Sequence, residues 1–475
     1  MIGVRVFQLL VVSGVLLAML GQGMMLSFPS CLLPALLEGS SGIMLDLDTA
    51  SWLASSVGLS SLAGFLASSY LMETCGRRTT FALAILPGAL GWVFIYFSKD
   101  ITTLMIGRVL GGTSGGATVL LGAVILGEYT SPENRGMFLN LKSAAVCVGN
   151  LAVHVLNHYI DWRNIALVAL LPFVISFGLV CSWEESPSWL ASMGFLEKCE
   201  DVFFALRGRN DRTYQEFDNL LKLQKTLLSP RLSKTVMIKK FLSLFTKRSF
   251  LKPLLIVVIS GFLSEFSGRH VFPAYASQII GEITGDKVQS FYYTLSIDLI
   301  ITSSITFSSV LVRIMKRRVL LFSTGALSLI VLTSVCLYLH VASKNFITYE
   351  SWIPLSLFVV YFVLANVCCA PFPYIIVGEI FPLSYKGAGT AVSGVFFSLL
   401  LMIALKITPY LLISLNVYGT FAIFAIIILI CLVLLYIILP ETKDRSLPEI
   451  ESYLQTGKYD AVEDETLKKK MIDDS

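Results

Sequence analysis

Ionisable side chains interrupt several long apolar stretches of this 475-residue sequence. Such residues are costly inside a membrane and mark candidate functional sites. Glu265 and Arg269 are four positions apart with the acid first, which is a favourable order for pairing along one helix. Asp298 lies in the next apolar stretch. Either Glu265 and Arg269 neutralise each other beside a wet cavity, or one of the carboxyl groups of Glu265 and Asp298 binds a coupling proton.

Two histidines, His154 and His158, are also four positions apart, and Asp161 follows them. Two histidines on one helical face can bind zinc, but the sequence assures no third ligand. We interpret them as polar residues at an interface and predict no metal site and no cofactor. The sequence shows no pairing of a nucleophile with a base, and its nine cysteines have no metal-binding or disulfide spacing. We therefore predict that the protein is not an enzyme.

The elements that position these residues are predicted to be membrane-spanning helices. Hydrophobic residues make up 55% of the chain and charged residues 14%, whereas a soluble domain carries about 25% charged residues. A spanning helix needs roughly 20 mostly apolar residues. By this rule we expect twelve spans, near residues 5–28, 52–73, 79–97, 102–127, 137–160, 163–183, 252–280, 289–311, 319–341, 351–378, 387–413 and 416–438.

The distribution of lysine and arginine predicts the orientation of these spans. Most of the 36 basic residues lie near the termini, in one long loop or in loops on the same side of the predicted membrane. The opposite loops carry only Lys99, Arg163, Lys287 and Lys344. Because basic loops stay on the cytoplasmic side, we expect both termini and the long loop to be cytoplasmic. The net charge of +4 then reflects topology and does not indicate a nucleic-acid-binding surface.

The long loop divides the spans six and six. We expect an N-terminal bundle over 1–183, a loop with short helices over 184–250, a C-terminal bundle over 251–439 and a tail over 440–475. Ser186 and Pro187 suit the N-cap and the first position of a short helix. Repeated halves are typical of alternating-access transporters, which bind substrate between the halves near the bilayer midplane.

Charged motifs recur at the same place in each half. In the first, Glu128 is followed seven positions later by Arg135; in the second, Glu379 is followed by Lys386. Arginine pairs after spans two and eight could bridge to these glutamates and hold the inner side shut in the outward-open state. Alternatively, they only anchor the inner interface. The predicted latch residues are Glu73, Arg77, Arg78, Arg108, Glu128, Arg135, Arg317, Arg318, Glu379 and Lys386.

Several motifs resemble the sugar porter family of the major facilitator superfamily, and the resemblance covers nearly the whole chain. They are Gly107-Arg108, Ser186-Pro187-Ser188-Trp189-Leu190, Ala205-Leu206-Arg207-Gly208, Pro371-Phe372-Pro373-Tyr374 and Pro440-Glu441-Thr442-Lys443. Two further motifs are similar to insect trehalose and glucose transporters: Ser51-Trp52-Leu53-Ala54-Ser55 and Gly378-Glu379-Ile380. The resemblance implies an all-α membrane protein of twelve helices in two pseudo-symmetric six-helix bundles. It also implies a plasma-membrane location, a lipid bilayer around a monomer, and a small-molecule substrate such as a sugar.

The resemblance also implies where substrate would bind, and there the sequence departs from the family. The family uses a glutamine in span five and a Gln-Gln-x-Ser-Gly-x-Asn motif in span seven, and this chain has neither. The matching polar and aromatic positions are Ser143, Ser264, Glu265, His270, Tyr275 and Tyr374. Span one has no acid where proton-coupled members carry an aspartate, which favours facilitated transport. A proton-coupled carrier, an organic-anion carrier and a non-transporting sensor on the same scaffold remain alternatives.

Overall fold

The computed structural model describes residues 2–37, 45–130, 132–209, 211–227, 243–285, 287–381, 386–443, 445 and 447–456. These residues form helices joined by short connections, and none of them lies in a strand. The first half contains α1 (Ile2–Ser27), α2 (Pro29–Leu37), α3 (Leu47–Thr74), α4 (Arg77–Tyr96), α5 (Ile101–Tyr129), α6 (Pro132–Tyr159) and α7 (Trp162–Cys181). Short helices follow: α8 (Pro187–Ser192), α9 (Leu196–Arg207), α10 (Asp211–Leu227) and the 3-10 turn η1 (Ser243–Thr246).

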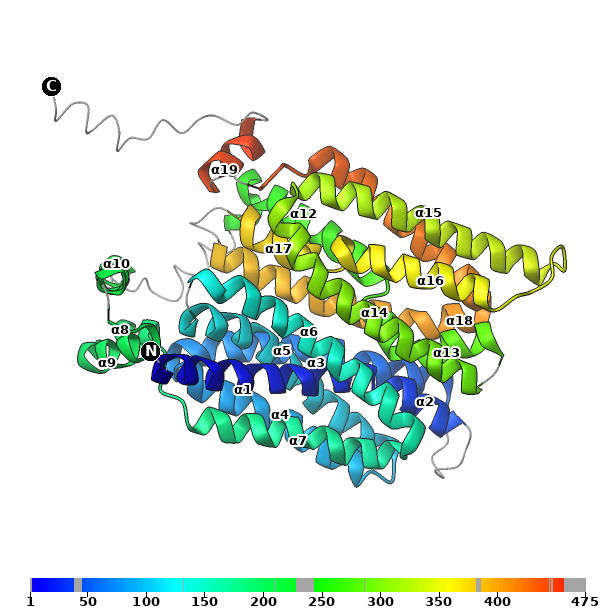
Figure 1. The fold of residues 1–475 in the computed structure, drawn as a ribbon, viewed down its shortest axis with the longest axis horizontal. Coiled ribbons are helices and arrows are strands. Elements are labelled where there is room, and N and C mark those ends of the chain that lie inside the picture. The colour runs from blue at the N-terminus through cyan, green and yellow to red at the C-terminus, as the bar shows by residue number, and fades with distance from the viewer. Residues whose placement is uncertain are drawn as a thin grey trace.

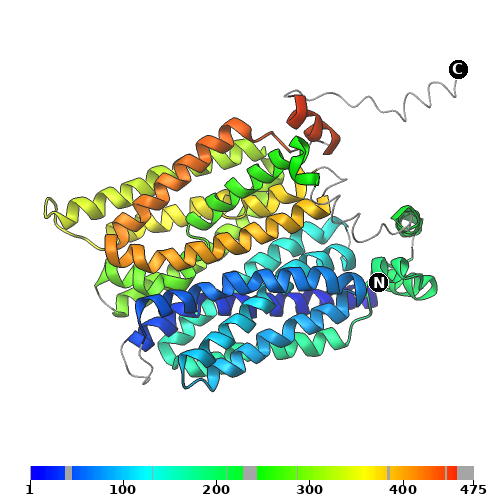
Figure 2. The ribbon, with the colours of Figure 1, turned by 180° about the vertical axis from the view of Figure 1, so that it is seen from behind.

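The second half repeats the layout with two interrupted spans. Its elements are α12 (Arg248–Phe266), α13 (Val271–Thr284), α14 (Lys287–Ile314), α15 (Arg317–Ser343), α16 (Trp352–Leu364), the π-helical turn η2 (Ala365–Cys369), α17 (Phe372–Ile380) and α18 (Lys386–Ile438). A final helix, α19 (Leu447–Thr456), follows. Figures 1 and 2 show the two halves side by side, with the spanning helices running along the length of the molecule.

Twelve spans are present, as the sequence predicted. The described residues hold eleven helical stretches that are long and apolar enough to cross a membrane, and one of them, Gly387–Ile438, has 52 residues. At 1.5 Å per residue this stretch is roughly 78 Å long, more than twice the ~30 Å hydrocarbon core. Its backbone breaks at Asn416, where φ is 56° and ψ is −177°. Because such a residue cannot continue an α-helix, α18 consists of two spans.

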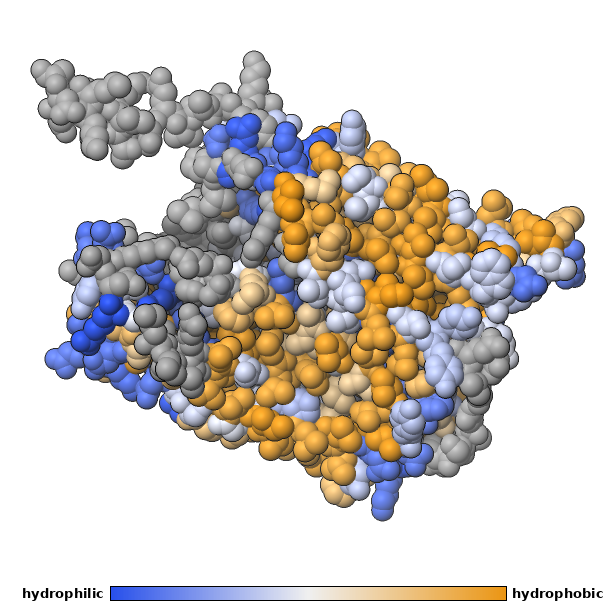
Figure 3. Space-filling model, in the orientation of Figure 1, coloured by the Kyte–Doolittle hydropathy of each residue, from blue (hydrophilic) through white to orange (hydrophobic). Residues whose placement is uncertain are grey.

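The outer surface of the bundle suits lipid. Apolar side chains cover its flank and polar residues gather at its two ends in Figure 3. Large apolar side chains exposed on the spanning helices include Leu171 of α7, Ile330 of α15 and Ile437 of α18, which are 55%, 63% and 72% exposed. One end carries α8–α10 and α19 (Figure 1), and we call it the motif end. We call the opposite end, which carries the residues between α15 and α16, the far end.

Glycines let the helices of the first half approach closely. A Cβ atom added at Gly64 of α3 would lie 1.8 Å from the Thr113 carbonyl oxygen of α5. One added at Gly116 of α5 would lie 1.9 Å from the Ser61 carbonyl oxygen of α3. Backbones can touch in this way only where side chains are absent, and dispersion forces then hold helices together in lipid. These glycines of α3 and α5 therefore serve helix packing.

Candidate functional site

A break between α12 and α13 places the charged residues of the seventh span. Helix α12 ends at Phe266, and Gly268 then takes a φ of 86°, a conformation that other residues rarely adopt. The freed carbonyl of Ser267 accepts a hydrogen bond of 3.0 Å from the Tyr361 hydroxyl. Non-helical backbone at membrane depth is tolerated where it is buried in protein or lines a cavity. Arg269 and His270 therefore do not continue the α-helical path of α12.

This break makes the predicted pair of Glu265 and Arg269 wrong. The buried carboxylate of Glu265 instead contacts Nδ1 of His270 at 2.9 Å. Arg269 donates to the Ala370 carbonyl at 3.0 Å and lies 4.7 Å above the Tyr374 ring. The i, i+4 rule needs a continuous helix, and α12 stops one residue after Glu265.

A second irregularity faces the first. The π-helical turn η2 interrupts the tenth span, and such turns are frequent at functional sites. It is followed by the Ala370 carbonyl, which accepts from both Ser264 Oγ at 2.8 Å and Arg269 Nη1 at 3.0 Å. Within the turn, Asn366 donates to the Phe362 carbonyl at 2.9 Å. The two bonds to the Ala370 carbonyl tie the broken seventh and tenth spans together.

A cavity of about 30 Å³ lies between the halves at the level of these breaks. Small-molecule sites usually have roughly 300–1,000 Å³, so the cavity in this conformation holds only water-sized molecules. Its walls come from α6 of the first half and from the α12–α13 break, α14 and η2 of the second half. The lining residues are Ser143, Val146, Cys147, Asn150, Arg269, His270, Pro273, Asp298, Ile301, Ile305 and Asn366.

One face of α6 supplies the polar wall of the first half. Ser143, Cys147, Asn150 and His154 follow each other at spacings of four, three and four residues, which is the period of one helical face. Asn150 is 8% exposed, and its Oδ1 atom has no hydrogen-bond partner among the described residues. A buried amide oxygen without a partner costs free energy unless water or a ligand satisfies it. Asn150 was missed in the sequence, although its helical spacing from Ser143 could have revealed it.

Two of the six predicted substrate-binding residues line the cavity, and four do not. Ser143 and His270 line the cavity. Tyr374 is 46% exposed and holds Arg269 through its ring. The other predicted residues do not line the cavity: Ser264 and Glu265 are buried in the contacts described above, and the Tyr275 hydroxyl donates to the Leu405 carbonyl at 2.7 Å.

At the cavity wall, His154 of α6 meets Asp298 of α14 across the two halves. Nδ1 of the imidazole lies 2.5 Å from Oδ2 of the carboxylate, and the two side chains are 2% and 3% exposed. Nε2 of the same ring lies 3.1 Å from the Pro273 carbonyl oxygen. His158, one turn further along α6, stacks on Phe291 with ring centroids 4.0 Å apart. The two histidines therefore serve different contacts, and the described residues contain no cluster of three potential metal ligands.

The halves also meet at the far end. Lys406 of α18 contacts Asp48 of α3 at 2.6 Å, and the Tyr410 hydroxyl donates to the same carboxylate at 2.8 Å. The Lys406 ammonium lies 4.3 Å from the centroid of the Trp52 ring. With the pair of His154 and Asp298, these contacts hold the far end closed in this conformation.

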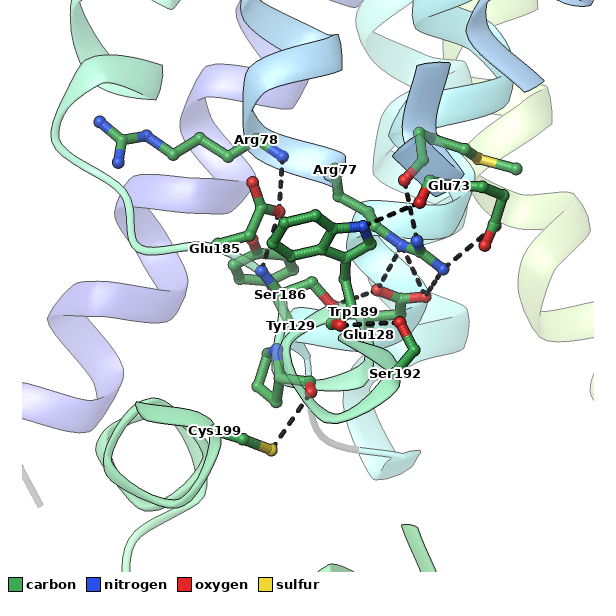
Figure 4. Close-up of polar contacts among 12 residues, drawn as sticks. Glu73, Arg77, Arg78, Glu128, Tyr129, Glu185, Ser186, Trp189, Ser192 and Cys199 are labelled. Carbon is green, nitrogen blue, oxygen red and sulfur yellow. Dashed lines mark hydrogen bonds and ion pairs between the residues drawn. The ribbon is translucent and has the colours of Figure 1, made fainter. Parts of the chain in front are cut away.

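At the motif end, Arg77 forms the centre of a network in the first half (Figure 4). Its guanidinium donates to both carboxylate oxygens of Glu128, with Nε at 3.2 Å from Oε2, and it contacts Glu73 at 3.4 Å. Ser186, the N-cap residue of α8, donates its hydroxyl to Glu128 and accepts no capping hydrogen bond from its own helix. Trp189 of α8 donates to the Glu73 carbonyl at 3.1 Å. The network thus fastens α8 to the ends of α3, α4 and α5.

The second half repeats this network around Arg317. Its Nη2 donates to Glu379 at 2.9 Å, and Thr442 donates to the other Glu379 oxygen at 2.6 Å. Glu441 accepts from the backbone N–H groups of Arg317 and Arg318 at 2.9 and 3.0 Å. In the first half, Glu185 accepts likewise from the Arg78 N–H group, at 2.9 Å.

The second arginine of each pair makes other contacts than the predicted bridge to glutamate. Arg78 donates to the last carbonyls of α7, reaching Cys181 at 2.7 Å, and does not contact Glu128. Arg318 likewise donates to the Tyr436 carbonyl at 3.0 Å, near the end of α18, and does not contact Glu379. Helix C-termini carry unpaired carbonyls and a partial negative charge, so these arginines cap them.

Two other features of the predicted latch differ from what the structure shows. Both networks join elements of a single half, so in this conformation neither connects the two halves. Arg108 is fully buried about 30 Å along α5 from Glu128, where it donates to the Leu53 carbonyl at 3.0 Å. It also donates to the carbonyls of Met25 and Ala54 and therefore ties α5 to α1 and α3. The side chains of Arg135 and Lys386 lie outside the described part of the structure.

Comparison with known proteins shows which family this chain is similar to. Residues 40–454 match the family model "Sugar (and other) transporter". The facilitated trehalose transporter Tret1 of Apis mellifera ligustica is 28% identical over 446 residues, covering 94% of this chain and 87% of that protein. The protein of the same name from Bombyx mori is 26% identical over 436 residues, covering 89% and 83%.

Among solved structures, the inward-open xylose transporter XylE from E. coli superposes with a TM-score of 0.76. The two sequences are 17% identical, and the match covers 94% of this chain and 99% of that one, which establishes a shared fold. A second XylE structure, of a major facilitator superfamily proton:xylose symporter, matches with a TM-score of 0.73. The chain therefore belongs to the sugar (and other) transporter family, whose members are membrane transporters and not enzymes.

Proposed function

We propose that this protein carries a sugar, a hexose or a disaccharide such as trehalose, through the membrane by facilitated alternating access. The observation that supports this most strongly is the cavity between the halves, where Asn150 presents an unpartnered amide oxygen beside Ser143 and Asn366. Amides and hydroxyls offer both donors and acceptors to sugar hydroxyl groups. The names of the insect relatives favour trehalose as the first sugar to test.

The first span favours facilitated transport over proton-coupled transport. Proton-coupled sugar porters carry an aspartate in this span, where the stretch from Gly21 to Met25 of this chain has no acid. The amide of Gln22 donates to Ser114 at 3.2 Å in the interior of the first half. None of these five side chains can release a proton near neutral pH, so the stretch lacks a coupling carboxyl group.

The orientation follows from the charge distribution. Basic loops favour the cytoplasmic side, which puts the motif end in the cytosol and the far end outside the plasma membrane. The two arginine networks then lie at the cytoplasmic ends of the halves. We propose that they keep each half rigid, and that their charged faces act as latches between the halves when the motif end closes.

Uptake by proteoliposomes tests the proposal. Purified full-length protein should take up labelled trehalose or glucose with saturation, and unlabelled sugar should compete. Imposing a pH gradient should produce no accumulation above the outside concentration. Absence of uptake of every hexose and disaccharide tested, by protein that unfolds cooperatively on heating, would overturn the proposal.

A second candidate function is transport of an organic anion, which Arg269 favours. Its guanidinium lines the cavity and contacts a carbonyl and an aromatic ring, and no described carboxylate pairs with it. Competition distinguishes the two functions: excess gluconate should leave glucose uptake unchanged if the substrate is a neutral sugar. Inhibition by gluconate that disappears in Arg269→Gln would support the anion.

A further inference from the structure

The two oxygen atoms that contact the His154 ring need two hydrogen-bond donors from it or between it and Asp298. Both ring nitrogens of His154 face oxygen atoms, with Asp298 Oδ2 at 2.5 Å from Nδ1 and the Pro273 carbonyl oxygen at 3.1 Å from Nε2. A carbonyl oxygen and an ionised carboxylate are acceptors only, whereas a neutral imidazole has a single N–H donor. A neutral His154 beside an ionised Asp298 would therefore leave one nitrogen lone pair pointing at an oxygen lone pair.

Burial makes that arrangement costly. The side chains of His154 and Asp298 are 2% and 3% exposed, and an unsatisfied polar group in such a place loses its hydration without compensation. Two protonation patterns satisfy both contacts. In one, an imidazolium donates from both nitrogens; in the other, a protonated Asp298 donates to Nδ1 while Nε2–H donates to Pro273. Both patterns hold two protons on the pair, one more than a neutral imidazole beside a carboxylate.

Three charged or titratable residues near the pair, Arg269, His270 and His158, have partners of their own. Arg269 lines the same cavity and opposes an added proton, but its guanidinium is bound to the Ala370 carbonyl and Tyr374, whereas Asp298 touches the imidazole directly. His270 is paired with Glu265, and His158 is stacked on Phe291. Two further charged groups lie on the elements packed around the pair: Lys142 of α6 donates to the Val119 carbonyl at 2.9 Å, and Glu282 of α13 accepts from the Val417 N–H group at 2.8 Å. The other described titratable residues on these elements are Cys31 of α2, Cys147 and Tyr159 of α6, Tyr275 of α13, and Tyr292 and Tyr293 of α14.

We propose that His154, Asp298 and the Pro273 carbonyl form a proton-binding site that joins the two halves, and that opening of the far end releases its proton. His154 lies on α6 of the first half, and the other two groups lie on α14 and α13 of the second half. Separation of the halves exposes both side chains to water. A hydrated imidazole titrates near pH ~6.5 and a hydrated carboxyl group near pH ~3.9, so at neutral pH the separated pair keeps one proton on His154. The second proton passes to water on the far side.

The direction of the pH effect follows from the number of protons that the pair binds in each conformation. Above about pH 6.5 the closed far end binds one more proton than the open far end, so raising the pH favours opening. Linkage sets the limit at about a tenfold change in the ratio of open to closed molecules for each pH unit. Below about pH 6.5 the separated imidazole is also protonated, and the dependence flattens. This gate makes the conformational equilibrium respond to pH without requiring that a proton cross the membrane.

Pulsed electron-spin distance measurements test the site without any substrate. Spin labels at Lys99→Cys and Lys344→Cys report the separation of the halves, because both residues are exposed and lie at the far end, one in each half. The three native cysteines that are not buried, Cys75, Cys147 and Cys181, are replaced by serine. The full-length chain is measured in nanodiscs from about pH 5.5 to about pH 8.5, a range centred on the titration of imidazole.

We expect the open population of the parent protein to rise with pH above about 6.5, by up to about tenfold per unit. His154→Gln should remove this dependence, and so should Asp298→Asn, which serves if the first variant does not fold. His158→Gln is the matched control on the same helix and should keep the parent slope, since that ring stacks on Phe291. A parent protein whose populations ignore pH, or a folded His154→Gln variant with the parent slope, would overturn the proposal. Because no sugar is added, either result leaves the proposed transport function untouched.

Discussion

The pair of Arg77 and Glu128 should stabilise the first half measurably, although it lies near the surface. The perturbation is a double-mutant cycle of Arg77→Gln and Glu128→Gln, which removes each charge and keeps similar side-chain size. The guanidinium donates to Glu128 from Nε at 3.2 Å and from Nη2 at 3.2 Å. The two side chains are 11% and 18% exposed, so water screens the pair only in part.

The magnitude follows from that geometry. Hydrogen bonds to charged groups contribute about 1.5–3 kcal/mol, whereas exposed ion pairs contribute about 0–1 kcal/mol. We expect a coupling energy of about 1–2 kcal/mol between Arg77 and Glu128. Arg77→Gln alone should cost about 2–3 kcal/mol, because it also leaves the Met72 carbonyl without its donor and the Glu128 carboxylate without its counter-charge.

The free energy of unfolding in mixed micelles, followed by tryptophan fluorescence, measures these quantities. The cycle of Arg317→Gln and Glu379→Gln should give a slightly smaller coupling energy, since those side chains are 14% and 28% exposed. The cycle of Lys198→Gln and Glu184→Gln is the exposed control, because these two side chains are 60% and 50% exposed. A coupling energy for Arg77 and Glu128 no larger than that of the exposed pair would refute the reasoning.

Three further predictions concern the interior and the far end. Arg108→Lys keeps the charge but cannot reach the carbonyls of α1 and α3 at once, so it should lower the free energy of unfolding by about 2–4 kcal/mol in the same assay, and an unchanged stability would contradict it. Asn150→Ala should raise the KM for the transported sugar about tenfold, the effect of losing about 1.4 kcal/mol of binding, with little change in unfolding; an unaltered KM would remove Asn150 from the site. Asp48→Asn should raise the ratio of open to closed molecules, read from the spin-label distances, by up to about fivefold. The pair of Asp48 with Lys406 is partly exposed, so high salt should raise the same ratio in part in the parent protein and leave it unchanged in the variant.

The spans, their division into halves and the arginine–glutamate pairs could all be predicted from the sequence, because local rules govern them. A bilayer requires about 20 apolar residues for each helix whatever the tertiary fold, so the spans follow from composition alone. The loop motifs recur with the same spacing, and in each half the predicted bond forms, from Arg77 to Glu128 and from Arg317 to Glu379. The contacts of Arg78 with the end of α7 were missed because its proximity to that end depends on how the helices pack.

The candidate site could be predicted only in part. Ser143 and His270 line the cavity as expected, and Asn150, whose helical spacing from Ser143 could have indicated it, was recognised through its unpartnered oxygen. The wrong pairing of Glu265 with Arg269 has a definite cause. Helical spacing predicts partners on a continuous helix, and the turn at Gly268 ends that continuity between the two residues.

The sequence by itself determined that this protein is a two-half membrane carrier with charged motifs at one end, since hydropathy, charge placement and motif spacing are read along the chain. Only the tertiary structure decided which polar groups meet inside it. His154 and Asp298 are 144 residues apart, and they touch because α6 of one half packs against α14 of the other. The partner of a buried charge is chosen by helix packing across the halves, and no local pattern in the sequence records that choice.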